Sequence, residues 1–268
     1  MSQYPNQSSF AQQPMPPTKQ YFRFDFWRSF NYIFENPKGF QNTLICALCV
    51  FVPIVGPVAL YGYQLEVMHS LHLSRGQTYA DFDFDRLGDY LIRGLWVVLL
   101  ILIASLIVLP IVWVVGFVWM MLGAGVSLAG PEAAPFVFLV FLPVMFLFFS
   151  MVSVLLGLTL FPMVLRAGWG LDFGSAFDLK FVLQFVGNVW KRFLVTSLLM
   201  IPVGFAACFV GMIAACVGIY FTIAVVQLMA AHLAWQHYEL HLSEGGQPVL
   251  YRINSQTPSH GSGDWPQH

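Results

Sequence analysis

The stretch GLWVVLLILIASLIVLPIVWVVGFVWMMLGAGVSLAGP, residues 94–131, contains no Asp, Glu, Lys or Arg. The other long stretches that lack these charged residues are at 39–65, 133–165 and 193–238. A helix crosses the roughly 30 Å hydrocarbon core of a bilayer in about 20 residues. The chain has 58% hydrophobic and only 9% charged residues, with a mean hydropathy of +0.71. This composition indicates an all-α, polytopic integral membrane protein.

The number of spans depends on how these four stretches divide. The last has room for two helices, and the stretches at 94–131 and 133–165 each suit one long helix. Residues 39–65 are open to three interpretations, a full hairpin, a re-entrant hairpin or one kinked span, because PIVGP at 53–57 interrupts them. A full hairpin places all 12 Lys and Arg residues on one side of the membrane, as the positive-inside rule requires of the cytoplasmic side. We therefore predict about six transmembrane helices in three hairpins, with both termini cytoplasmic, in the cytoplasmic (bacterial inner) membrane.

Amphipathic segments precede the first and the third predicted hairpin. At 22–35 and at 177–189, Phe and other apolar residues recur at helical spacing with polar residues between them. This pattern is typical of helices that lie in the membrane surface, so we expect in-plane lead-in helices. We divide the chain into a disordered cytoplasmic tail at 1–20, a single transmembrane domain at 21–241 and a flexible cytoplasmic tail at 242–268.

Several of these segments resemble a known family. YIFENPKGF at 32–40 and VPIVGPVALYGYQLEVM at 52–68 are followed by an acidic segment that runs into LIRGL at 91–95. With SAFDLKFVLQFVGNVWKRF at 175–193 and the end of the apolar region, they resemble the domain of unknown function 4013 family. The most specific elements are the Pro-x-x-Gly turn at 53–56 and the pair Gly62 and Tyr63. The resemblance implies a multi-pass bacterial or archaeal membrane protein with no assigned activity.

The acidic stretch TYADFDFDRLGDYLIRG, residues 78–94, carries aspartates at 81, 83, 85 and 89. It matches a calcium-binding EF-hand loop only in part, since Arg86 stands at the glycine position and Ile92 at the position of the bidentate glutamate. Aspartates at the start of a helix complement its dipole. We interpret the stretch as the solvated start of the next membrane helix.

Histidine and cysteine pairs are the other candidates for metal or redox chemistry. His237 and His241 are one helical turn apart, but no glutamate directly follows the first, as a metalloprotease motif would require. We interpret them as part of an interfacial belt. Cys46 and Cys49 have redox-motif spacing without a neighbouring base or cation, so we expect apolar packing. The sequence thus predicts no catalytic residue, no cofactor and no metal site.

Glu66 is the only acidic or basic residue inside a predicted span. Near the membrane midplane an isolated carboxylate is costly, so it would be protonated or would find a partner such as Tyr63, Gln227 or His232. In a shallow hairpin it would lie at the cytoplasmic interface without a partner, and this is the arrangement that we favour. Glu66, Tyr63, Gln227 and His232 together form the candidate intramembrane polar site.

Three classes of function fit the sequence. The absence of a catalytic constellation favours a non-enzymatic protein that organises membrane lipid or acts as a partner scaffold. A transporter or channel subunit is suggested by proline-interrupted spans. A lipid-modifying enzyme would have to use His69 and His72 near the acidic stretch. The expected partners are the lipid bilayer and a protein partner or a second copy of the chain, and no nucleic acid.

Overall fold

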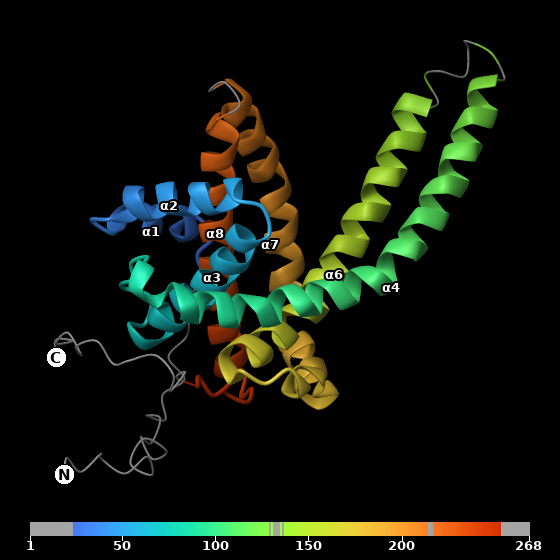
Figure 1. Cartoon of the computed structure of the whole chain (residues 1–268). Helices are drawn as coiled ribbons and strands as arrows, with labels where there is room; N and C mark the ends of the chain where they lie inside the picture. The colour runs from blue at the N-terminus through green and yellow to red at the C-terminus, as the bar shows by residue number, and fades with distance from the viewer. Residues whose placement is uncertain (1–23, 129, 131–134, 136, 214–216, 253–268) are drawn as a thin grey trace, which may run out of the picture.

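The computed structural model describes residues 24–128, 130, 135, 137–213 and 217–252, and all regular structure within these ranges is helical. The predicted tail at 1–20 lies outside them, as does Cys216. The elements, labelled in part in Figure 1, are α1 (Arg28–Glu35), α2 (Gly39–Phe51), α3 (Val55–Leu73), η2 (Phe84–Arg86), α4 (Leu87–Leu128), η4 (Val137–Phe141), α6 (Leu142–Gly170), η5 (Gly174–Phe177), α7 (Leu179–Ile213) and α8 (Val217–Ser243).

Four helices of the described chain are long and apolar enough to cross a membrane, namely α4, α6, α7 and α8. The structure does not confirm six spans. The helix α2 has 13 residues, and at 1.5 Å per residue it measures about 20 Å, which is short of the roughly 30 Å core. The helix α3 is longer, with 19 residues, but polar side chains interrupt it.

The helix α4 is too long for one straight span. Its 42 residues measure about 63 Å, twice the hydrocarbon core. Pro110 lies inside the helix, where it removes one backbone hydrogen bond and favours a kink. In Figure 1 the first part of α4 runs crosswise to α7 and α8, like α2, and its second part turns upward beside α6.

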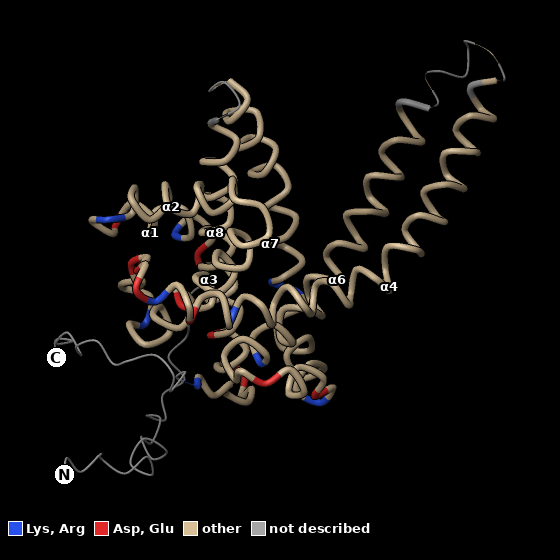
Figure 2. The backbone as a smooth tube through the Cα atoms, viewed as in Figure 1, with Lys and Arg blue, Asp and Glu red and all other residues tan. Residues whose placement is uncertain are grey.

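Two helical pairs rise from a common base (Figure 1). The pair α7 and α8 stands upright, and the second part of α4 leans away from it together with α6, so the two pairs diverge toward their tips. Figure 2 shows that the Lys, Arg, Asp and Glu residues gather at the base, whereas the described tips carry none. This distribution follows from the three long charge-free stretches of the sequence.

The buried core lies in the base, around α3. Its largest fully buried side chains include Tyr63 and Leu71 of α3, Tyr90 of α4, Trp169 of α6 and Tyr238 of α8. The indole Nε1 of Trp169 donates to the carbonyl oxygen of Leu65 at 3.1 Å and so joins α6 to α3. The base is therefore packed like a soluble domain, while the tips of the helices expose apolar side chains.

Candidate functional site

Glu66 forms the centre of a buried polar cluster in the base. It lies on α3, and its side chain is only 9% exposed. Arg86 donates from Nη1 to Oε1 of Glu66 at 2.9 Å, and the hydroxyl of Tyr251 donates to Oε2. The carboxylate thus has a charged and a neutral donor, one on each oxygen.

Tyr251 is held on both faces of its ring. His69 stacks on it with 3.6 Å between ring centroids, and the guanidinium carbon of Arg93 lies 3.9 Å from the ring centroid. Arg93 is buried and donates from Nη1 to the carbonyl oxygen of Gly168 at 2.9 Å. We call Glu66, His69, Arg86, Arg93 and Tyr251 the Glu66 cluster.

Residues 244–252, the C-terminal strap, bring Tyr251 into the cluster. The backbone N–H of Val249 donates to the hydroxyl of Tyr238 at 2.9 Å, and that of Arg252 donates to the carbonyl oxygen of Trp169 at 2.8 Å. The sequence predicts a flexible tail from residue 242; in the structure α8 ends at Ser243, and Val249 and Tyr251 of the strap pack against the core of the base. Residues 253–268 of that predicted tail lie outside the described chain.

The cluster changes the acidity of its members. Burial alone raises the pKa of Glu66, but the charge of Arg86 and the hydrogen bonds from Arg86 and Tyr251 outweigh it, so this pKa lies below its usual value. Burial lowers the pKa of His69 to about 4. At neutral pH the cluster therefore holds an ionised Glu66 beside a neutral His69.

The other members of the predicted polar site form hydrogen bonds with groups other than Glu66. The hydroxyl of Tyr63 donates to the carbonyl oxygen of Ala80 at 2.9 Å. Gln227 accepts from Gln64 Nε2 at 2.9 Å, and His232 Nδ1 lies 2.9 Å from Gln236 Nε2.

The side chains that form hydrogen bonds with Glu66 are instead Arg86 and Tyr251, which no sequence pattern predicts as site residues. From the sequence, Arg86 is a cytoplasmic basic residue at the glycine position of a partial calcium loop, and Tyr251 belongs to the predicted flexible tail. The only sequence feature that could have indicated the contact is the run VLY at 249–251, an apolar segment in an otherwise polar C-terminus.

The acidic stretch connects separate segments of the base through the side chain of Asp81. The carboxylate of Asp81 accepts from Asn36 Nδ2 at 3.0 Å and from Asn42 Nδ2 at 3.1 Å, and it pairs with Lys38 Nζ at 3.2 Å. Burial raises the pKa of Asp81, but these three donors lower it by more, so the pKa lies below its usual value. Asp83 accepts from the backbone N–H of Asp85 at 2.9 Å and caps η2. Asp81 thus ties the α1–α2 region to the segment before α4.

The two histidines at 237 and 241 of α8 contact different side chains. His237 Nε2 lies 3.0 Å from Thr196 Oγ1, and His241 Nδ1 lies 3.2 Å from Asn188 Nδ2. Within the described ranges, no group of three or more His, Cys, Asp or Glu side chains is arranged to hold a metal ion. Cys46 is fully buried, and burial raises the pKa of its thiol, which keeps it in the unreactive protonated form.

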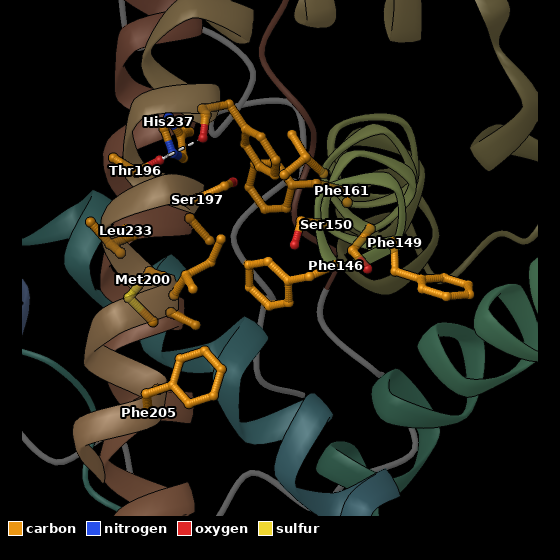
Figure 3. A pocket seen from close by; sticks show the side chains of 18 of the residues that line it. Phe146, Phe149, Ser150, Phe161, Thr196, Ser197, Met200, Phe205, Leu233 and His237 are labelled. Carbon is orange, nitrogen blue, oxygen red and sulfur yellow. Dashed lines mark hydrogen bonds between the residues drawn. The ribbon is translucent and has the colours of Figure 1, made fainter. Parts of the chain in front are cut away.

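A cavity of about 770 Å³ lies between α6, α7 and α8, and no sequence pattern predicted it. Figure 3 shows His237 and Thr196 at one end and Phe205 at the other. Its wall is rich in Phe and includes the hydroxyls of Ser150, Ser153 and Ser197. Of the described residues that line it, none is Asp, Glu, Lys or Arg. The cavity suits an uncharged, elongated ligand.

Comparison with known proteins supports the resemblance seen in the sequence. Residues 45–216 match the family described as "Protein of unknown function (DUF4013)". The match includes the Pro-x-x-Gly turn, Gly62 and Tyr63, and Glu66. No curated protein and no solved structure matches the chain.

Proposed function

This chain belongs to the DUF4013 family, and we propose that it is a non-enzymatic, multi-pass protein of the cytoplasmic membrane that organises lipid at the cytoplasmic surface. The observation that carries this proposal is the outer face of α1 and α2. Apolar side chains are exposed at a spacing of three or four residues, at Trp27, Phe30 and Phe34 and at Phe40, Leu44, Leu48 and Phe51. This spacing places each set on one face of its helix.

The opposite faces of α1 and α2 are fixed to the bundle. Tyr32 and Ile33 are buried, and the hydroxyl of Tyr32 donates to the carbonyl oxygen of Leu228 on α8 at 2.6 Å. Asn42 and Cys46 are buried on the inner face of α2. Exposing one large apolar side chain to water costs about 1.5–3 kcal/mol, so seven such side chains on anchored helices favour contact with lipid.

The topology that accounts for these features has four spans. In this proposal α2 and α3 enter the cytoplasmic leaflet and return, and α4, α6, α7 and α8 cross the membrane. Both termini are cytoplasmic, and the charged base lies on the cytoplasmic side, in agreement with the positive-inside rule. The arrangement corresponds to the re-entrant interpretation of residues 39–65.

The lipid contact of α2 can be tested with spin-labelled phospholipid. We expect the triple substitution Phe40→Ser, Leu44→Ser and Leu48→Ser to lower the number of motionally restricted lipids per protein in reconstituted vesicles, because it removes the apolar face. Electron paramagnetic resonance of phosphatidylglycerol labelled near its headgroup measures this number. The matched control Phe40→Leu, Leu44→Ile and Leu48→Ile keeps the face apolar and should keep the wild-type value. Equal numbers of restricted lipids in the two variants would contradict the proposal.

The topology can be tested with reporters and thiol labelling. A cytosol-dependent reporter fused after His268 should be active, and a periplasm-dependent reporter should be active only when inserted after Glu132. Ile54 in the α2–α3 turn is 82% exposed. In a variant without native cysteines, Ile54→Cys should resist an impermeant maleimide added from the periplasmic side. Labelling from that side would instead establish a full first hairpin and six spans.

A further inference from the structure

Two basic residues lie at one end of the cavity between α6, α7 and α8. Lys191 and Arg192 directly precede Phe193, which lines the cavity, and we call this end the foot of the cavity. Both side chains are exposed, and neither forms a hydrogen bond or an ion pair with the described residues. Residues 179–238 contain no Asp or Glu, and neither does α6. The foot therefore carries two cations without a counter-charge.

Helical spacing places both cations on the side of α7 that faces the cavity. Trp190 is three residues before Phe193, so the two rings lie on the same side of the helix. The ammonium of Lys191 lies 5.6 Å from the centroid of the Trp190 ring, which holds it on that side. Arg192 is four residues before Thr196, which also lines the cavity. An anion at the foot could therefore contact both basic side chains.

The two cations also lie where the charge-free part of α7 begins. Residues 193–213 of α7 carry no charge, and at 1.5 Å per residue they measure about 30 Å, the thickness of the hydrocarbon core. Lys191 and Arg192 are then at the level of the phospholipid headgroups when α7 crosses the membrane. Trp190 is half-exposed beside them, as is typical of an aromatic residue at the membrane interface.

The wall beyond the foot suits an acyl chain. None of the described lining residues is charged, so an ionised group would stay outside the cavity, at the foot. Ser197 lies beside Thr196 (Figure 3), and its hydroxyl, which forms no hydrogen bond with the described residues, can donate to an ester carbonyl. From Phe193 to Cys208 the wall follows α7 for about 22 Å. Cations, a hydroxyl and an apolar wall thus follow one another in the order of phosphate, ester and acyl chain in a phospholipid.

We propose that this cavity binds one anionic phospholipid of the cytoplasmic leaflet, with its phosphate at Lys191 and Arg192 and one acyl chain between α6 and α7. The chain can enter from the bilayer because α6 leans away from α7 toward its tip (Figure 1). The inference rests on the proposed topology, in which α6 and α7 cross the membrane, and not on the outer faces of α1 and α2.

Photolabelling of the full chain in dioleoylphosphatidylcholine vesicles tests the site. The two probes are a phosphatidylglycerol and a phosphatidylcholine that carry the same diazirine-labelled acyl chain, each at the same mole fraction. The phosphatidylglycerol probe should label cavity-lining peptides of α6 and α7 about tenfold more, because two basic residues near the membrane surface favour an anionic lipid. Equal labelling of these peptides by the two probes would overturn the proposal. Labelling by neither probe would also overturn it and would point to a protein segment as the occupant.

Two double variants assign the preference to the foot. Lys191→Gln with Arg192→Gln removes both cations and should reduce the preference for phosphatidylglycerol to less than about twofold. The matched control, Arg75→Gln with Lys180→Gln, removes two other exposed cations that do not adjoin the cavity and should keep the wild-type preference. An undiminished preference in the first variant would show that Lys191 and Arg192 do not bind the phosphate.

Two glycine variants test the acyl chain. A Cβ at Gly204, which lines the cavity, or at Gly125, which is exposed on α4 outside it, would meet no atom within 4 Å. Gly204→Leu fills the cavity and should remove most of the labelling by the phosphatidylglycerol probe, whereas Gly125→Leu should leave it unchanged. Wild-type labelling of Gly204→Leu would overturn the site.

The lipid contact of α2 can fail without this site. The triple substitution Phe40→Ser, Leu44→Ser and Leu48→Ser does not alter a residue that lines the cavity, so it should keep the preference of the cavity for the phosphatidylglycerol probe. Loss of that preference in the triple variant would show that the cavity is not an independent site.

Discussion

Replacing Glu66 with Ala is expected to lower the free energy of unfolding by about 3 kcal/mol. Removing one partner of a buried ion pair costs about 3–5 kcal/mol, because the other charge stays buried. The side chain of Arg86 is 38% exposed and can partly rehydrate, which places the expected loss at the lower end. Tyr251 would also lose the acceptor of its hydroxyl. Thermal unfolding of the purified protein should show a Tm lower by about 6–12 °C.

Two further variants assign this loss to the cluster. In Glu66→Gln the amide can accept from Arg86 and donate to Tyr251, so only about 1 kcal/mol should be lost at neutral pH. Glu35→Ala removes an exposed carboxylate on α1 and should change the stability by less than about 0.5 kcal/mol. If Glu66→Ala were as stable as Glu35→Ala, the cluster would have no structural role.

The pH dependence of the stability of the folded protein follows from the lowered pKa of Glu66. A carboxyl group with a lower pKa in the folded state than in the unfolded state stabilises the protein fully above the unfolded value, about 4.3. That contribution disappears as the pH falls through the folded pKa. The stability difference between the wild type and Glu66→Gln should therefore be present at pH 7 and vanish in strong acid.

The sequence was sufficient to predict the membrane class and the gathering of charged residues at one end of the long helices. Both features depend on composition and on the positions of charged residues, and these can be taken directly from the sequence. The four long helices correspond to the charge-free stretches at 94–131, 133–165 and 193–238. The α2–α3 region is ambiguous from the sequence because a charge-free stretch of 27 residues permits both a short hairpin and a single span.

The Glu66 cluster could not be predicted in this way. Arg86 and Tyr251 are 20 and 185 residues away from Glu66 along the chain. Their meeting depends on how each helix is rotated about its axis. In a soluble helix an apolar stripe specifies that rotation, but α3, α4 and α8 do not separate polar from apolar residues onto different sides, so the pattern carries no such information. The cavity is hidden for the same reason, since it arises from the angle between α6 and α7.

Backbone contact between α3 and α4 fixes how each of these helices is rotated about its axis, which the hydrophobic pattern does not specify. A Cβ at Gly62 would lie 1.8 Å from the carbonyl oxygen of Tyr90, and a Cβ at Gly94 would lie 1.8 Å from that of Val58. The two glycines thus let the helices touch at positions four residues apart on each. This contact holds Glu66 on α3 within reach of Arg86, directly before α4. Gly62 therefore has a physical reason to be among the most specific features of the family resemblance.

Gly62→Ala and Gly94→Ala are each expected to destabilise the protein by about 3 kcal/mol, at the upper end of the cost of overpacking, because the obstacle is backbone and cannot rotate away. Gly88→Ala is the matched control on α4. A Cβ there meets nothing within 4 Å, so the better helix propensity of Ala should raise stability by up to about 1 kcal/mol. In thermal unfolding, the same Gly→Ala change should therefore lower the Tm at positions 62 and 94 and raise it at position 88. The double variant should cost less than the two single losses together, because either methyl group already forces the helices apart. Full additivity would mean that the two glycines act at independent contacts, and stability equal to that of Gly88→Ala would mean that α3 and α4 do not touch there.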